Sequence, residues 1–409
     1  MLRKLPRYLI ISHMTKRNSN FNKLKSNYLF PEINQRKQQF LARHPGVSLI
    51  SLGIGDTTEP ISPHITNGLV LGSSRLATAD GYQGYGPEQG MKVLRERVAA
   101  TFYPGLIRPE DVFVSDGAKC DLGRLQTLFG RGVSIAVQDA AYPVYVDGSL
   151  ILGVENIVLM PCPPENNFFP ILEKMPRTDL IYFCSPNNPT GAVATRAQLQ
   201  SLVAFAKANR SIIIFDSAYS HYIQDPSLPR SIFEIPGAEE VAIEVGSFSK
   251  IAGFTGVRLG WTVVPEQLKY EDGFSVRADW NRLMSTLFNG ASNIAQWGGC
   301  AVLEKEGLEE IDALRNFYME NTRLLKESLD ASKQDVFGGE NAPYLWVRFK
   351  GKSSWDIFQY FLEELHLVVT PGVGFGSGGE GFIRLAAFGH RENILQAAKK
   401  LKTRLCTFF

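Results

Sequence analysis

The sequence predicts an α/β fold with two domains, the larger built on a mainly parallel sheet of seven strands and the smaller also α/β. Seven short apolar runs follow one another between residues 111 and 264, and helical stretches such as 196–209 separate several of them. This alternation is typical of a parallel sheet with helices on both faces. A chain of 409 residues is also too long for one small core, which favours a second domain.

The composition is that of an ordinary globular protein and gives no support for nucleic-acid or membrane binding. Hydrophobic residues make up 44% and charged residues 21%, with a net charge of +2. No basic run is interleaved with aromatic residues, and no apolar run is long enough to span a membrane. The five cysteines show no Cys-x-x-Cys spacing, which argues against a zinc site or a disulfide framework and favours a reducing compartment.

The N-terminal region is basic, with seven basic residues and no acid in residues 1–31. A transit peptide has this bias, but an upstream extension of residues 1–13, before Met14, is the simpler interpretation. The sequence then predicts a helix over 30–39 and a strand over 47–52, followed by a glycine-rich loop at 53–58. Further helices are predicted over 63–76 and 89–102.

The predicted large sheet begins at residue 111. Its strands are expected at 111–115, 134–137, 155–160, 180–184, 211–215, 241–245 and 261–264. The first strand runs into a helix at Gly117–Lys119, where free N–H groups at the helix N-terminus can bind a phosphate. Tyr142 follows the second strand and is placed either to stack on an aromatic cofactor or to lie in the core.

The C-terminal third supplies the second domain. Long helices are predicted over 281–305 and 309–332, and strands over 344–349, 368–370 and 382–386. Arg384 lies inside the last of these runs, and a buried arginine needs an anionic partner, either a structural salt bridge or a ligand. We expect the small domain to comprise 14–62 and 296–409 and the large domain 63–295.

The stretch from Ser247 to Gly260 carries the chemistry. Lys250 follows a buried strand, where desolvation lowers the pKa of an amine and prepares it for Schiff-base formation. Ser247, Ser249 and Arg258 supply hydroxyl and guanidinium donors suited to a phosphate dianion. A lysine beside a phosphate cup is the outline of a pyridoxal phosphate site, although a surface lysine in a Ser/Gly loop would also have this sequence.

Two segments upstream complete this outline. Asp216 ends an apolar strand, where a carboxylate can hold the pyridine nitrogen of the cofactor protonated. Asn188, in Asn-Asn-Pro-Thr-Gly, and Tyr219 can reach the phenolic oxygen of the cofactor. Taken singly, Asp216 could cap a helix and Asn-Pro-Thr-Gly could be an ordinary turn.

Together and in this order, these motifs resemble the fold-type I pyridoxal-phosphate-dependent aminotransferases over nearly the whole chain. The resemblance implies Lys250 as the catalytic residue and Arg384 as the residue that grips the substrate α-carboxylate. It also implies that the loop at 53–58 lies over the substrate. The implied cofactor-binding residues are Tyr85, Ala118, Lys119, Tyr142, Asn188, Asp216, Tyr219, Ser247, Ser249, Lys250 and Arg258.

Three stretches, 53–60, 84–90 and 115–121, resemble those family members whose substrate is LL-diaminopimelate. The implied reaction interconverts LL-diaminopimelate plus 2-oxoglutarate and tetrahydrodipicolinate plus glutamate, on the route to lysine and peptidoglycan. The implied substrate contacts are Tyr28, Gly55, Glu88, Lys119, Asn188, Asn289 and Arg384, with Tyr85, Glu88 and Asn289 serving the neighbouring subunit of a homodimer. The expected location is the bacterial cytoplasm, with organellar import of a plant-like homologue left open.

Several alternatives remain at this stage. An aminotransferase for aspartate or aromatic amino acids would share the fold, and a carbon–sulfur lyase would share every cofactor residue. A non-catalytic domain tethered to a DNA-binding module is disfavoured, because residues 1–50 are too short for a helix-turn-helix module. Glu88 could instead serve only to cap the helix predicted to begin at Gln89.

Overall fold

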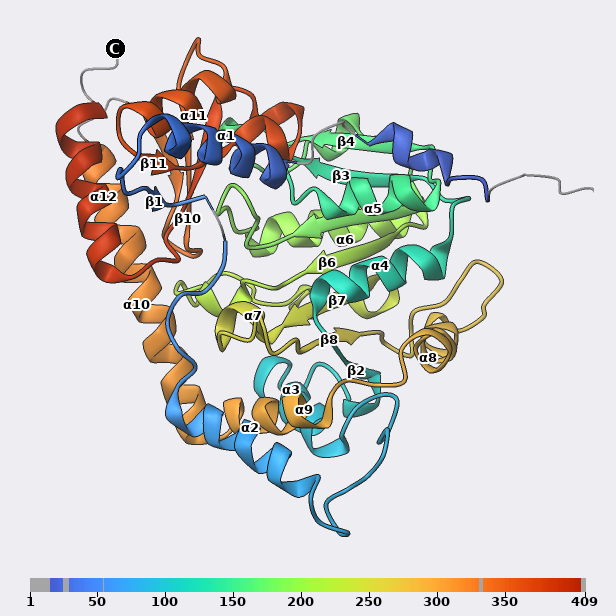
Figure 1. Cartoon of the computed structure of the whole chain (residues 1–409). Helices are drawn as coiled ribbons and strands as arrows, with labels where there is room; N and C mark the ends of the chain where they lie inside the picture. Colours follow the sequence, from blue (N-terminus) through green and yellow to red (C-terminus); the bar gives the residue numbers. More distant parts are fainter. Residues whose placement is uncertain (1–14, 25–28, 54, 331–333, 406–409) are drawn as a thin grey trace, which may run out of the picture.

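All seven predicted strands of the large domain lie in one sheet, in the order β2-β8-β7-β6-β5-β3-β4 (Figure 1). The computed structural model describes residues 15–24, 29–53, 55–330 and 334–405, so the predicted extension at 1–13 lies outside the described residues. Only β8 runs antiparallel to its two neighbours, which confirms the mainly parallel sheet. The strands are β2 (Val112–Ser115), β3 (Ile135–Asp139), β4 (Ile157–Pro161), β5 (Leu180–Cys184), β6 (Ile212–Asp216), β7 (Ala242–Ser247) and β8 (Gly260–Val263).

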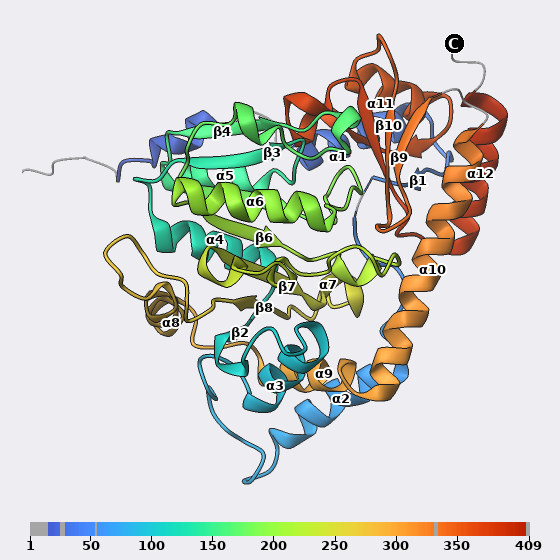
Figure 2. The same cartoon turned by 180° about the vertical axis from the view of Figure 1, so that it is seen from behind.

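Both faces of this sheet are covered by helices. Side chains alternate between the faces along a strand, so in β5 Tyr182 packs in one apolar cluster while Ile181 and Phe183 pack in another. Helices α4 (Ala118–Phe129), α5 (Val144–Leu152) and α8 (Val276–Leu287) contribute to the first cluster, and α6 (Arg196–Asn209) to the second. Helices α4 and α5 are in front in Figure 1, and α6 is in front in Figure 2.

A second, antiparallel sheet has the strand order β12-β13-β10-β9. Its strands are β9 (Asp335–Gly338), β10 (Tyr344–Arg348), β12 (Thr370–Pro371) and β13 (Phe382–Ala386). Beside it, β1 (Ile50–Ser51) pairs in parallel with β11 (Leu367–Val368). The predicted strand at 368–370 is therefore divided between two sheets, the one at 47–52 is shorter than expected, and β9 was not predicted. Helices α1 (Leu29–Arg43), α11 (Ser354–Glu363) and α12 (Arg391–Arg404) lie around these strands (Figure 1).

Helices on one side of the molecule connect the two sheets. The long helix α10 (Lys305–Leu329) runs from α9 (Asn293–Val302) to the second sheet and packs against α12 (Figure 2). Helices α2 (Pro63–Arg75) and α3 (Lys92–Phe102) both pack against α9. None of the helices in the described part of the chain is both long and apolar enough to cross a membrane.

The single helix predicted over 281–305 is wrong, because the chain breaks between α8 and α9. Asn289 and Gly290 both adopt positive φ angles, 65° and 93°, which a right-handed helix cannot accommodate. Helix α3 also begins at Lys92 rather than Gln89, with Met91 as its N-cap. Residues 84–89, before α3, and 289–290, between α8 and α9, therefore lie in loops that are partly exposed.

Candidate active site

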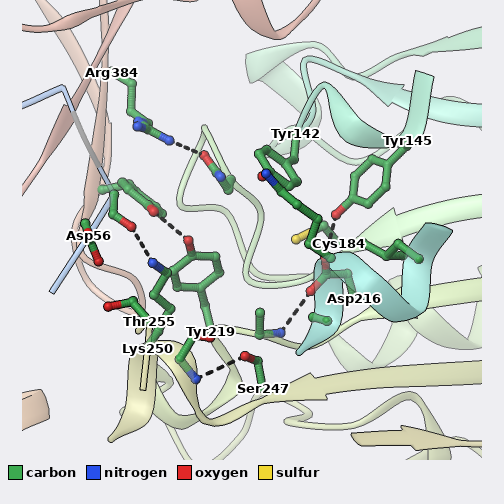
Figure 3. A pocket seen from close by; sticks show the side chains of 18 of the residues that line it. Asp56, Tyr142, Tyr145, Cys184, Asp216, Tyr219, Ser247, Lys250, Thr255 and Arg384 are labelled. Carbon is green, nitrogen blue, oxygen red and sulfur yellow. Dashed lines mark hydrogen bonds between the residues drawn. The ribbon is translucent and has the colours of Figure 1, made fainter. Parts of the chain in front are cut away.

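The candidate site lies at the carboxyl ends of neighbouring strands of the large sheet. Strands β5, β6 and β7 are mutually parallel, so Cys184, Asp216 and Ser247 come together at one edge. There they line a cavity of about 530 Å³ that segments from the second sheet close from the other side (Figure 3). The cavity is lined by Gly55, Asp56, Ala118, Lys119, Leu122, Tyr142, Tyr145, Cys184, Asn188, Asp216, Ala218, Tyr219, Ser247, Ser249, Lys250, Thr255, Arg258, Tyr344 and Arg384.

Lys250 lies in this cavity, on the short helix α7 (Phe248–Ile251) that follows β7 directly. Its Nζ donates a hydrogen bond to the carbonyl of Gly55, and its own carbonyl accepts one from the Tyr222 hydroxyl at 2.9 Å. Burial lowers the pKa of Lys250 to about 8, and the nearby charge of Asp56 partly opposes this shift. An amine with such a pKa is available as a nucleophile and as a base near neutral pH.

Asp216 is a buried carboxyl group without a cationic partner among the described residues. Its oxygens accept hydrogen bonds from the Tyr145 hydroxyl at 2.8 Å and the Ala218 N–H at 3.0 Å. Burial raises the pKa of Asp216, and the hydrogen bonds from Ala218 and Tyr145 only partly compensate for its buried charge. A positively charged N–H group in the cavity would supply that compensation, which is what a protonated pyridine nitrogen offers.

Another part of the cavity, formed by Ser247, Ser249, Arg258 and the start of α4, is arranged to bind an anion. Gly117 is the N-cap of α4, with φ +122°, and a Cβ added there would lie 2.6 Å from Nη2 of Arg258. The absence of a side chain thus allows the guanidinium to approach the helix N-terminus, whose N–H groups favour negative charge. The Ser247 hydroxyl accepts from the Ser249 N–H at 3.0 Å, and Arg258 Nη1 donates to the Thr255 carbonyl at 3.0 Å. An amine, a carboxyl group and an anion cup in one cavity fit pyridoxal phosphate.

Aromatic hydroxyls and an amide also line the cavity. Tyr219 and Tyr344 share a hydrogen bond of 2.6 Å between their hydroxyls, while Asn188 Oδ1 accepts from Arg384. The ring of Tyr142 lines the cavity, and Nζ of Lys119 is 5.5 Å from the centre of that ring. The structure therefore brings Tyr142, Asn188 and Tyr219, which the sequence predicted to contact a cofactor ring, into one cavity.

Arg384 is the only arginine among the described residues that is fully buried, with 2% of its surface exposed. Its Nη1 and Nη2 donate to Asn188 Oδ1 and the Gly53 carbonyl, both at 2.6 Å, while its Nε has no partner. No ion pair between Arg384 and an acid occurs within the described ranges, so the structural salt bridge considered from the sequence is not found. Its buried charge is balanced only by neutral oxygens, which favours an anionic ligand.

Three predicted site residues lie outside this cavity. Tyr85, Glu88 and Asn289 are exposed, and Tyr85 has 79% of its surface accessible. The loops that carry Glu88 and Asn289 are adjacent, since a Cβ on Gly290 would lie 3.6 Å from Cα of Glu88. The Glu88 carboxylate accepts from the Ser285 hydroxyl, so its bonding partner is a side chain of α8 and not the start of α3. The predicted contact Tyr28 lies outside the described residues.

Several lining residues were missed from the sequence. Tyr145 follows Tyr142 by three residues, one turn along the chain, and that spacing could have indicated a second inward-facing tyrosine. Tyr344 lies on a strand that was predicted, but nothing in the sequence connects it with Tyr219. Asp56 lies within a glycine-rich loop that was singled out, without a role for its acid.

Comparison with known proteins gives consistent matches along the chain. The family model described as aminotransferase class I and II matches residues 47–401. A chloroplastic LL-diaminopimelate aminotransferase of Arabidopsis thaliana is 57% identical over 406 residues, covering 96% of this chain and 88% of that protein. The LL-diaminopimelate aminotransferase of Protochlamydia amoebophila is 55% identical over 400 residues, covering 95% and 97%. The solved structure of L,L-diaminopimelate aminotransferase from Chlamydomonas reinhardtii matches with a TM-score of 0.92 at 54% identity, covering 96% and 99%.

Proposed function

The chain belongs to the class I and II aminotransferases and is a transaminase of fold-type I, and on that basis we propose LL-diaminopimelate as its substrate. The proposed reaction interconverts LL-diaminopimelate plus 2-oxoglutarate and tetrahydrodipicolinate plus glutamate. The observation that carries the transaminase chemistry is the cavity in which Lys250, Asp216 and the anion cup meet Arg384. The choice of diaminopimelate rests on the similarity to relatives of that name over nearly the whole chain.

Pyridoxal phosphate is the cofactor that fold-type I aminotransferases use, and when bound it supplies an electron sink for negative charge at the substrate Cα. In our proposal Asp216 holds the ring nitrogen, Asn188 and Tyr219 hold the phenolic oxygen, and Tyr142 covers one face of the ring. Ser247, Ser249, Arg258 and the start of α4, at Ala118 and Lys119, hold the phosphate, with Tyr85 of the partner subunit. Lys250 anchors the cofactor and acts as the base that removes and returns the proton at the substrate Cα.

Both amino acids of the reaction carry an α-carboxylate, which we assign to Arg384. Its guanidinium already points into the cavity and donates to two neutral oxygens that a carboxylate can replace or join. Because both substrates use the same contact, Arg384 contributes to binding of each and not to the choice between them.

The distal end of LL-diaminopimelate carries an ammonium group that glutamate lacks. We propose that Glu88 of the partner subunit accepts from this ammonium, with Asn289 of the partner subunit beside it. Tyr28, Gly55, Lys119 and Asn188 of this chain are the proposed contacts of the remaining polar groups. A homodimer is part of the proposal, supported by the exposed, adjacent positions of Glu88 and Asn289 outside their own cavity.

We also propose a division into a large domain, 63–295, and a small domain, 14–62 with 296–409, with the cavity between them. The cytoplasm is the proposed compartment. This proposal is supported by the cysteines in the described part of the chain, which are free thiols: Cys120, Cys162, Cys184 and Cys300.

Formation of glutamate from LL-diaminopimelate and 2-oxoglutarate tests the proposed function. The purified protein with added pyridoxal phosphate should produce one glutamate for each LL-diaminopimelate consumed. Release of pyruvate from cystathionine, without glutamate formation, would instead identify a carbon–sulfur lyase. A higher kcat/KM with aspartate or an aromatic amino acid would be consistent with a transaminase but would contradict the assignment of diaminopimelate as its substrate.

A further inference from the structure

We propose that Asp139 is a positioning residue for Arg384, although it lines no part of the cavity itself. Asp139 ends β3 of the large sheet, and its side chain holds a glycine-rich segment, 372–379, that precedes the strand of Arg384. The inference rests on the proposed function in one respect, because it takes Arg384 as the group that binds the substrate α-carboxylate.

The carboxylate of Asp139 is the centre of this contact. It is buried, and its two oxygens accept from two consecutive residues of the segment: the Ser377 hydroxyl at 2.6 Å and the Gly378 N–H at 2.8 Å. Gly376, with φ +132°, passes so close that any Cβ there would collide with Oδ1 of Asp139. The segment is therefore folded closely around one acidic side chain.

The same segment is attached to β3 by a second, backbone contact. The Ala141 N–H, two residues after Asp139, donates to the Phe375 carbonyl at 2.9 Å. Three hydrogen bonds with Asp139 and Ala141 thus hold residues 375, 377 and 378 of the segment. Ala141 directly precedes Tyr142, which lines the cavity, so the attachment lies at the edge of the site.

Phe375 transmits this attachment to Arg384. The centre of its ring lies 4.9 Å from the guanidinium carbon, and the ring of Tyr344 lies 4.6 Å from it. Phe375 also makes an edge contact with Trp346, at 5.9 Å between ring centres. Since Arg384 has no acidic partner among the described residues, these rings and two neutral oxygens determine where its fork points. Displacing Phe375 would therefore misplace the fork.

If Asp139 had only a structural role, Asp139→Ala would lower the free energy of unfolding without a specific effect on binding of the substrate α-carboxylate. A positioning role predicts a specific kinetic pattern. Asp139→Ala should raise KM for glutamate and for LL-diaminopimelate by a similar factor, about 10- to 100-fold, with kcat changed less than about threefold. Asp139→Asn should restore KM largely, because an amide keeps an acceptor for Gly378 and can donate to the Ser377 oxygen.

The chain offers a control in Asp179, which directly precedes β5 and so lies at the opposite end of that strand from Cys184, the residue that lines the cavity. Its carboxylate also accepts from a serine hydroxyl and a backbone N–H, those of Ser134, both at 2.7 Å. Asp179→Ala should lower the melting temperature but leave both KM values within about twofold, so it separates lost stability from lost positioning. If Asp139→Ala does not fold, Ser377→Ala carries the test, with a smaller rise in both KM values.

A double-mutant cycle with Arg384→Lys decides the proposal. If Asp139 acts through Arg384, adding Asp139→Ala to Arg384→Lys should raise KM less than about threefold further. Full additivity of the two effects, or a control Asp179→Ala that raises KM as much as Asp139→Ala, overturns the inference. If Arg384→Lys alone leaves KM unchanged, it is the proposed role of Arg384 that fails, which is a different result.

Discussion

Replacing Arg384 by lysine tests whether this residue binds the α-carboxylate that the substrates of both half-reactions share. The guanidinium makes two bonds of 2.6 Å in different directions, to Asn188 Oδ1 and to the Gly53 carbonyl, and is flanked by two aromatic rings. A lysine ammonium keeps the positive charge but cannot span both oxygens and present a planar fork to a carboxylate. Losing one bond of a bidentate charged pair costs about 1.5–3 kcal/mol, which corresponds to a rise in KM of roughly 10- to 150-fold.

The assay is steady-state kinetics with glutamate and LL-diaminopimelate, each at a saturating concentration of its oxo-acid partner. KM for both amino acids should rise by similar factors, while binding of pyridoxal phosphate, followed by absorbance, stays largely unchanged. A rise for only one of the two amino acids would show that Arg384 is not the shared carboxylate contact. Loss of cofactor binding at the same time would indicate that the substitution disrupts the whole cavity and does not only remove the bidentate contact with the carboxylate.

Three further predictions concern other parts of the molecule. The purified protein should be yellow, and borohydride reduction followed by peptide mapping should label Lys250; Lys250→Ala should abolish both the label and turnover, and a label on another lysine defeats this assignment. Glu88→Gln should lower kcat/KM for LL-diaminopimelate about 30- to 150-fold, from a loss of about 2–3 kcal/mol, and affect glutamate far less; equal losses in single-turnover rates of both half-reactions would remove the specificity role. Glu244 is buried in β7, accepts from the hydroxyls of Tyr103 and Ser231, and burial raises its pKa from 4.5 to about 7. The folded state therefore binds the proton more tightly than the unfolded state, so the free energy of unfolding should fall as pH rises from about 4.5 to 7, by up to about 3 kcal/mol. Urea unfolding at several pH values should show that Glu244→Gln removes most of this slope, and an unchanged slope would contradict it.

The large sheet was predictable because most of its strands, though not the edge strand β4, are buried on both faces. Runs such as Leu180–Cys184 are continuously apolar, and the structure places that strand at the predicted residues. The two-residue strands β1 and β11 could not be delimited in this way, because they are too short to show a pattern. The break near Asn289 depends on two residues with positive φ, and an asparagine within an otherwise helical pattern gives only a weak signal.

The candidate site was predictable where a residue of suitable chemistry directly follows a predicted strand. Lys250, Asp216 and Arg258 each follow a strand or belong to a glycine-rich stretch, so their convergence follows from the parallel sheet. Tyr145 and Tyr344 were not predictable, since their roles depend on contacts with Asp216 and Tyr219 that are 71 and 125 residues away in the chain. The same holds for Asp139, whose partners lie 238 and 239 residues further on.

The stereochemical preference of the transamination tests the central claim most directly. LL-diaminopimelate and meso-diaminopimelate have the same atoms and charges and differ only in configuration at one α-carbon, so any other transaminase that accepts them by charge alone would treat them alike. With 2-oxoglutarate as acceptor, glutamate formation from the LL isomer should be at least about tenfold faster in kcat/KM than from the meso isomer, aspartate or phenylalanine. Equal rates with the two isomers, or a higher kcat/KM with aspartate, would contradict the assignment of LL-diaminopimelate to this site.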